Sequence, residues 1–181
     1  MDRTHIEPCS HQETDEGAQA MSTFRPEQIQ VGPCTINVQK RLDLPKNPVL
    51  LLHGASFSAQ TWNELGTLDQ LAQAQYPVLA MDMPGFGQSP PCEANKGDLL
   101  QTVINDLGLE KPVVIGPSRG GRYCLQFVLS NPEQVGGLVL IGGVGIEANK
   151  DRLKTIRVPT LLLWGSEDGI SPPQYGELLH Q

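Results

Sequence analysis

Five short apolar runs set limits on the fold that this chain of 181 residues can adopt. Unbroken apolar runs of this length are typical of strands buried on both faces, as in a parallel sheet. Four of the five open with a proline, which a strand tolerates at its first residue. The runs span residues 48–52, 77–81, 112–115, 137–141 and 159–164.

The segments between these runs predict helices. One apolar face is formed by Trp62, Leu65, Leu68, Leu71 and Ala72. A second is formed by Leu99, Leu100, Val103, Ile104 and Leu107, and it ends at Gly108. Strands that alternate with helices predict an α/β fold with a doubly wound, mostly parallel sheet and flanking helices.

The N-terminal part of the chain predicts different structure. Residues 29–31 and 35–39 flank Gly32-Pro33-Cys34, which predicts a β-hairpin with a three-residue loop. Residues 1–25 are acidic and carry no periodic pattern. We expect a disordered acidic leader over these residues, followed by a domain over residues 26–181. The alternative is that translation starts at Met21.

Charge and composition restrict the partners. The net charge of −7 argues against nucleic acid or an anionic membrane surface as the main partner. The longest apolar runs are too short to span a bilayer, and the first seven residues lack the apolar core of a secretion signal. Cys9, Cys34, Cys92 and Cys124 lack metal-like spacing. We therefore expect reduced structural thiols, no metal site and a cytoplasmic protein.

The third apolar run, residues 112–115, leads into Gly116-Pro117-Ser118-Arg119-Gly120, and a helical segment follows at once. This order of strand, Gly-x-Ser-x-Gly turn and helix is the context of a nucleophile elbow. Side chains at Gly116 and Gly120 would collide with the neighbouring strand and helix. The sequence therefore predicts that Ser118 is a nucleophile held at positive φ.

Chemistry in such sheets collects at the carboxyl ends of the strands. His53-Gly54-Ala55 follows one strand, and its turn can aim backbone N–H groups at Ser118. We assign the oxyanion hole to the N–H groups of Ala55 and Arg119, with Ser56 as an alternative to Ala55. His53 precedes the glycine directly, which favours a structural histidine over a general base.

Two further loops follow strands. Asp82-Met83-Pro84-Gly85-Phe86-Gly87-Gln88-Ser89 suits a compact turn, but it lacks the third glycine and the acidic residue of a dinucleotide site. Glu167 and Asp168 follow the last strand. A carboxylate there can orient a histidine on a neighbouring loop and stabilise its imidazolium form.

These four segments resemble the α/β-hydrolase superfamily, in the order His53-Gly54, Asp82 to Ser89, Gly116 to Gly120, and Gly165-x-x-Asp168. The resemblance selects Asp168 over Glu167 as the acid of a catalytic triad. Residues 51–72 resemble more narrowly the abhydrolase-domain-containing protein 14 group, whose members are small and lack a cap domain. The 17 residues between Ile141 and Pro159 are too few for a helical cap.

The resemblance implies a serine hydrolase of esterase type that acts on small acyl compounds without a cofactor. Members of the superfamily carry a further strand, a histidine loop and a closing helix after the acid, whereas this chain ends at Gln181. We expect a C-terminally truncated form and do not assign His180 as the base. The alternatives are an acyltransferase with the same serine and a non-catalytic ligand-binding module. We also expect residues 1–181 alone to have little or no activity and an exposed strand at 159–164.

Overall fold

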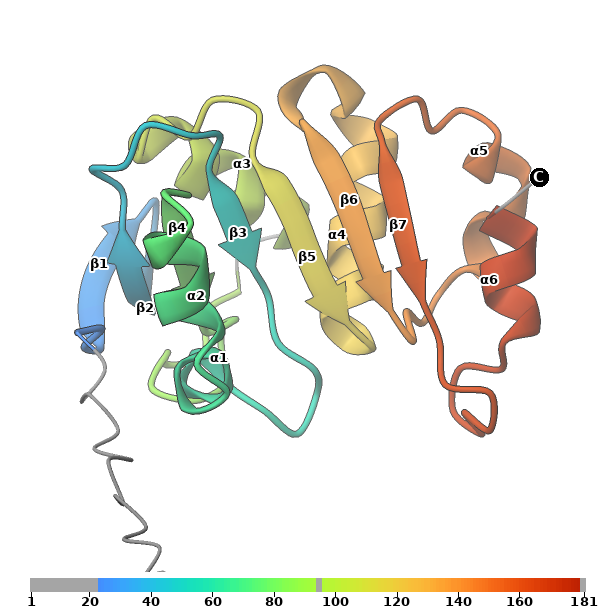
Figure 1. Ribbon diagram of the computed structural model, residues 1–181, viewed down its shortest axis with the longest axis horizontal. Helices are drawn as coiled ribbons and strands as arrows, with labels where there is room; N and C mark the ends of the chain where they lie inside the picture. The colour runs from blue at the N-terminus through green and yellow to red at the C-terminus, as the bar shows by residue number, and fades with distance from the viewer. Residues whose placement is uncertain (1–22, 94–95, 180–181) are drawn as a thin grey trace, which may run out of the picture.

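Every apolar run of the sequence becomes a strand of one seven-stranded sheet in the computed structural model, which describes residues 23–93 and 96–179 (Figure 1). The strand order is β1-β2-β4-β3-β5-β6-β7. β1 and β2 are antiparallel to their neighbours, and the other five strands run parallel. The strands are β1 (Glu27–Val31), β2 (Cys34–Arg41), β3 (Val49–Leu51), β4 (Val78–Met81), β5 (Val113–Pro117), β6 (Gly137–Ile141) and β7 (Thr160–Leu163).

The β1–β2 hairpin has a shorter loop than the three residues expected. Val31 pairs directly with Cys34, so only Gly32 and Pro33 form the turn. Gly32 adopts a φ of +53°, which glycine reaches without steric penalty. Cys34 is therefore the first residue of β2 and not part of the loop.

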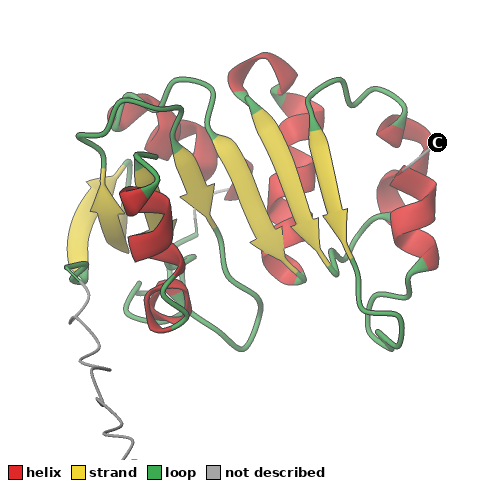
Figure 2. Cartoon of the chain, in the orientation of Figure 1, coloured by secondary structure: helices red, strands yellow, loops and turns green. Residues whose placement is uncertain are grey.

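The helices lie on both faces of the sheet (Figure 2). The apolar face predicted from Trp62 to Ala72 is divided between two helices, because Gly66 between them has a φ of +71°. The segment between β6 and β7 holds only a 3₁₀ turn at Glu147–Asn149 and one short helix, so it contains no helical cap. The helices are α1 (Ala59–Glu64), α2 (Thr67–Gln73), α3 (Lys96–Asp106), α4 (Arg119–Ser130), α5 (Lys150–Leu153) and α6 (Gln174–Leu179).

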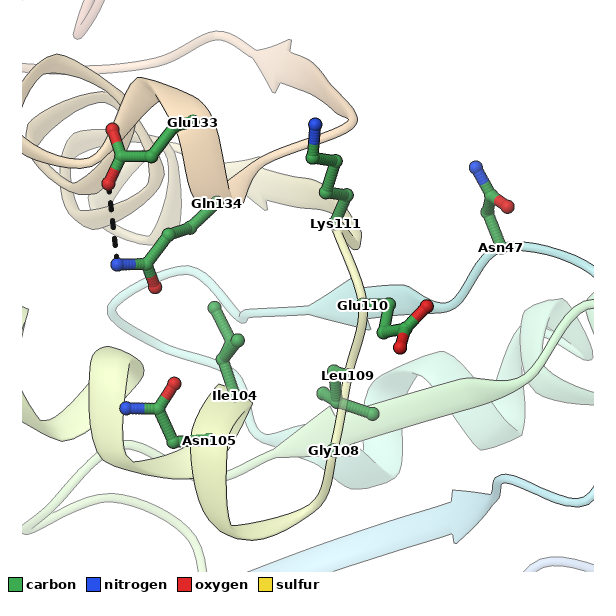
Figure 3. A pocket seen from close by; sticks show the side chains of 9 residues that line it. All are labelled: Asn47, Ile104, Asn105, Gly108, Leu109, Glu110, Lys111, Glu133 and Gln134. Carbon is green, nitrogen blue, oxygen red and sulfur yellow. Dashed lines mark hydrogen bonds between the residues drawn. The ribbon is translucent and has the colours of Figure 1, made fainter.

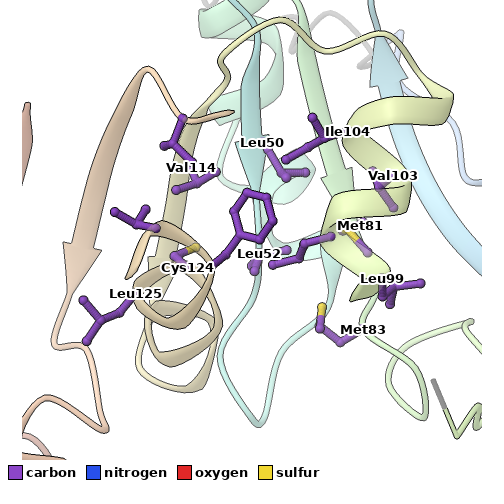
Figure 4. Close-up of a cluster of buried hydrophobic side chains, with 14 of the residues drawn as sticks. Leu50, Leu52, Met81, Met83, Leu99, Val103, Ile104, Val114, Cys124 and Leu125 are labelled. Carbon is purple, nitrogen blue, oxygen red and sulfur yellow. The ribbon is translucent and has the colours of Figure 1, made fainter. Parts of the chain in front are cut away.

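Each face of the sheet carries its own core, because alternate residues of a strand point to opposite faces. Leu50 and Leu52 of the β3 segment pack with residues of α3 and α4, including Val103 and Leu125 (Figure 4). On the opposite face, Val49 and Leu51 pack with Ala59, Leu68 and Ala72 of α1 and α2, and Phe24 is buried in the same cluster. The two cores fix the orientation of the strand ends that carry the candidate site.

The β7 end of the sheet is open in the described part of the chain. β7 pairs only with β6, and α1 and α2 cover the sheet over β3 and β4 (Figure 1). Leu161 and Leu163 keep 53% and 46% of their surface exposed. The predicted open edge strand is therefore confirmed. No helix among the described residues has the length and apolar character that crossing a membrane requires.

The expectation of reduced thiols is wrong for two of the cysteines. Cys34 and Cys92 form a disulfide with α-carbons 5.7 Å apart. A sequence separation of 58 residues hides this pairing, which arises because antiparallel pairing places the start of β2 beside the loop that follows β4. Cys124 in α4 is free and buried, and burial raises the pKa of its thiol above the usual value. Cys9 and residues 1–22 of the expected leader of residues 1–25 lie outside the described residues. Phe24 of that leader is buried in the core, so the ordered chain begins before the expected boundary.

Candidate active site

Ser118 occupies a sharp turn between β5 and α4, with φ of 47° and ψ of −113°. The positive φ predicted from the Gly-x-Ser-x-Gly spacing is confirmed, and such a conformation costs about 1–3 kcal/mol. A β-carbon at Gly116 would lie 2.4 Å from the backbone carbon of Gly120. One at Gly120 would lie 2.7 Å from the carbonyl oxygen of His53. Both glycines are therefore needed for the turn to form.

The backbone of Ser118 is anchored while its hydroxyl is free. Its N–H donates to the carbonyl of Ile141 at 2.9 Å, and its own carbonyl accepts from Val144 N–H at 3.2 Å. The side chain is half-buried and its Oγ has no hydrogen-bond partner among the described residues. The hydroxyl thus stands unpaired at the carboxyl edge of the parallel strands.

The loop after β3 packs directly against this turn. A β-carbon at Gly54 would lie 3.9 Å from the carbonyl oxygen of Pro117. Within the described residues, the N–H groups of Ala55, Ser56 and Arg119 have no acceptor. Arg119 begins α4, and the first N–H groups of a helix lack intrahelical partners. Free donors therefore lie on the loop that packs against the serine turn and on the residue that follows the serine.

His53 has a structural role, because both of its ring nitrogens make hydrogen bonds to the backbone. Its ring is buried, its Nδ1 lies 2.7 Å from the carbonyl of Gly54, and its Nε2 lies 3.1 Å from the N–H of Met83. Since Nε2 accepts from an amide, the ring proton is assigned to Nδ1, which donates to Gly54. Both nitrogens are thereby used to hold the loop. This geometry agrees with the structural histidine expected from the sequence.

Asp168 lies in the loop after β7, at the same edge of the sheet as Ser118. Its Oδ1 accepts from the N–H groups of Ile170 and Ser171 at 2.9 and 2.8 Å. Its Oδ2 faces Gly142, where a β-carbon would lie 2.8 Å away. Gly142 follows Ile141, which pairs with the residue before Ser118. Asp168 is half-buried, whereas Glu167 is exposed.

Asp82 is the residue whose role the sequence did not reveal. The carboxylate is buried and accepts three hydrogen bonds, from Ala59 N–H at 2.6 Å, Asn37 Nδ2 at 2.8 Å and Gln88 N–H at 2.9 Å. It therefore ties β2 and the start of α1 to its own loop. The signal available in the sequence was the run of glycines after Asp82, because a β-carbon at Gly87 would collide with this carboxylate.

The ring of Phe86 lies close to both His53 and Arg119, the residue after the serine. The guanidinium of Arg119 lies 5.3 Å from the ring centre of Phe86, which lies 5.4 Å from the ring of His53. Arg119 is exposed and forms no ion pair within the described residues.

A hollow of about 590 Å³ lies at the opposite edge of the sheet (Figure 3). Its lining includes Asn47, Lys111 and Gln134, which precede β3, β5 and β6. Ser118 follows the carboxyl end of β5, so this hollow is remote from the serine. The candidate site is defined by the strand ends and not by this hollow.

Comparison with known proteins identifies the family of this chain. The family model described as alpha/beta hydrolase fold matches residues 47–155. The chain belongs to the α/β-hydrolase family. Relatives include ABHD14A of Danio rerio, 40% identical over 131 residues, or 69% of this chain and 48% of that protein. ABHD14B of Homo sapiens, named as a candidate protein-lysine deacylase, is 37% identical over 72% of this chain and 66% of its own length.

Solved structures share the fold. A hydrolase of Thermoplasma acidophilum described as CIB-like superposes with a TM-score of 0.80 at 26% identity, covering 86% of this chain and 82% of that one. Naproxen esterase of Bacillus subtilis superposes with a TM-score of 0.71 at 21% identity, covering 87% and 78%. The chain spans about half the length of its ABHD14A relatives and 66% of ABHD14B. The resemblance to the abhydrolase-domain-containing protein 14 group is confirmed.

Proposed function

We propose that this chain is a serine hydrolase of esterase type. The observation that supports it is the strained backbone of Ser118 beside a free hydroxyl and free N–H groups at both flanks. Ser118 is the nucleophile, the N–H groups of Ala55 and Arg119 form the oxyanion hole, and Asp168 is the acid that orients a histidine. No cofactor or metal is needed for this chemistry.

The reaction is nucleophilic acyl transfer. The hydroxyl oxygen of Ser118 attacks the carbonyl carbon of the substrate, and its proton passes to a base. The negative charge that develops on the carbonyl oxygen is held by the two N–H groups. The leaving group departs with the proton, and water then releases the acyl group and restores the serine.

The substrate class follows from the open site and from the relatives. Small acyl compounds suit a site without a helical cap over the strand ends. The name of ABHD14B makes acylated lysine a second substrate class to include. An acyltransferase would use the same serine with an acceptor other than water.

The described residues supply no free base for Ser118, and this favours a second candidate function. His53 is the only histidine among the described residues, and both of its nitrogens are engaged. If no other histidine reaches Ser118, the site binds acyl ligands without turning them over. A non-catalytic ligand-binding module is therefore the alternative function.

The deciding experiment compares two proteins. One is the chain of 181 residues, and the other carries in addition the last strand, histidine loop and helix of a full-length relative. Both are assayed on p-nitrophenyl acetate and on an acetyl-lysine peptide, each beside its Ser118→Ala variant. We expect turnover and fluorophosphonate labelling only in the extended protein with Ser118 intact. Labelling that survives Ser118→Ala would move the nucleophile elsewhere.

A cytoplasmic location stays a prediction. The disulfide weighs against it, because such bonds persist mainly in oxidising compartments. A small-molecule acyl substrate, rather than nucleic acid or a membrane, is the partner that we propose from the net charge and the site.

A further inference from the structure

The Cys34–Cys92 disulfide lies at the same edge of the sheet as Ser118. β2 runs antiparallel to β4, and the N–H of Asp82 donates to the carbonyl of Asn37 at 2.9 Å. The pairing therefore continues one residue past the carboxyl end of β4. The first residues of β2 extend beyond the ends of the parallel strands, toward the loops that surround the candidate site.

The first residues of β2 and the loop that follows β4 are joined at two points. The N–H of Asn37 donates to the Oγ of Ser89 at 2.9 Å. Cys34 lies three residues before Asn37, and Cys92 lies three residues after Ser89. The disulfide and the hydrogen bond thus hold the segments side by side in antiparallel order. Cys34 and Ser89 are 1% and 4% exposed, whereas Cys92 is half-buried, so water reaches the junction only from the side of Cys92.

The junction also holds the loop that carries Ala55. Asn37 and Gln88, one from each segment, both donate to the Oδ2 of Asp82. The Oδ1 of Asp82 accepts from the N–H of Ala59, the first residue after this loop. At the other end of the loop, the N–H of Met83 donates to the ring of His53. Two neighbouring residues, 82 and 83, therefore fix both ends of residues 54–58.

We propose that Cys34 and Cys92 are an oxidative modification site, and that their disulfide holds the loop of residues 54–58 in place beside Ser118. The bond acts through Asn37, Ser89 and Asp82, which are positioning residues and touch no substrate in this scheme. Only the use of Ala55 N–H as an oxyanion donor rests on the proposed function. The bond and its effect on the loop are independent of it.

The modification is a thiol–disulfide exchange with a small disulfide oxidant such as oxidised glutathione. The half-buried Cys92 reacts first, and its thiolate displaces one glutathione thiol to give a mixed disulfide. The thiolate of Cys34 then attacks the sulfur of Cys92 and releases the second glutathione thiol. Two S–H bonds are lost, one S–S bond forms, and the two electrons reduce the oxidant to two thiols. A dithiol reductant reverses the exchange.

Cys124 does not compete for this exchange. It is buried in α4, and desolvation raises the pKa of its thiol, so the reactive thiolate is scarce at neutral pH. It therefore offers a matched control. Changing Cys124 to alanine removes a thiol without touching the junction.

The test uses the whole chain, oxidised with glutathione disulfide and then alkylated and digested without reductant. We expect a peptide pair linked through Cys34 and Cys92, which separates and becomes alkylated after dithiothreitol. In the folded protein, hydrogen exchange should quicken about tenfold or more at residues 53–59 and 82–92 on reduction, with α4 unchanged. Loop closure over 58 residues further predicts a fall in Tm of about 10 °C.

The variants distinguish the Cys34–Cys92 disulfide from its effect on the loop of residues 54–58. In the double variant Cys34→Ala, Cys92→Ala, hydrogen exchange should be as fast as in the reduced protein, and dithiothreitol should not change it. The Cys124→Ala variant should respond to dithiothreitol as the unchanged chain does. If the double variant fails to fold, the reduced unchanged chain still gives the comparison. Full alkylation of Cys34 and Cys92 after oxidation would overturn the modification site. Unchanged exchange at residues 53–59 on reduction would overturn the positioning role.

Discussion

The carbonyl oxygen of His53 lies directly against the α-carbon of Gly120, with no room for a side chain between them. A β-carbon at position 120 would stand 2.7 Å from this oxygen and 3.2 Å from the β-carbon of Leu52. The contact joins the end of the β3 segment to the first turn of α4. It therefore sets the spacing between the two loops that flank Ser118.

Gly120→Ala should lower the free energy of unfolding by about 1–3 kcal/mol, because backbone atoms on both sides must move to admit the methyl group. Urea unfolding followed by circular dichroism measures the change. Gly169→Ala is the matched control, since nothing lies within 4 Å of its β-carbon position and its φ is not positive. Equal midpoints for the two variants would mean that the contact is looser than described.

Asp82→Asn should destabilise the fold by about 2–3 kcal/mol, because the amide nitrogen faces N–H donors and one charge-assisted hydrogen bond or more is lost. Asp43→Asn is the control, because that carboxylate is largely exposed and its ion pair with Arg41 lies at the surface. Its removal should leave the urea midpoint unchanged. An Asp82→Asn midpoint equal to that of the control would remove Asp82 from its anchoring role.

The strands and the serine turn were predictable because they depend on local sequence. Buried parallel strands need continuous apolar residues, and the elbow needs glycines two residues either side of Ser118. Both requirements appear as patterns within a few consecutive residues. The break between α1 and α2 was also written locally, in Gly66, but a continuous apolar face concealed it.

The disulfide and the contacts of Asp82 were not predictable because they depend on strand order. Cys34 meets Cys92, and Asn37 meets Asp82, only after β2 has paired antiparallel with β4. Nothing within either segment specifies that pairing. Four scattered cysteines in an acidic chain favoured reduced thiols, and the fold brought two of them together.

Asp168→Asn should leave the fold intact and remove activity from the extended protein. Asparagine retains a carbonyl oxygen that can accept from the N–H groups of Ile170 and Ser171, so the loop keeps its turn. It cannot stabilise an imidazolium, and by analogy with serine proteases kcat should fall about 10⁴-fold. Turnover of p-nitrophenyl acetate measures the effect. Glu167→Gln is the control, and a larger loss in that variant would transfer the role of the acid to Glu167.

Cys124 should resist alkylation in the folded protein. Burial raises the pKa of its thiol, so at pH 8 the folded chain holds the proton that an unfolded chain has begun to lose. N-ethylmaleimide followed by peptide mass mapping should label Cys124 only in denaturant. Because the folded pKa is the higher one, the stability that this group contributes should be complete at neutral pH and decline as the pH rises above about 8.5. Rapid labelling under native conditions would contradict the burial.

The open face at β7 should drive self-association of the 181-residue chain. Leu161 and Leu163 project from a strand that has one neighbour among the described strands. Both an exposed apolar patch and unpaired backbone groups attract a second molecule. The double variant Leu161→Lys, Leu163→Lys should therefore shift sedimentation toward the monomer and lower light scattering on warming. Leu65→Lys is the matched control, because Leu65 is 65% exposed at the end of α1, away from this edge. If Leu65→Lys reduces association as strongly as the double variant, added positive charge rather than the β7 face would explain the change.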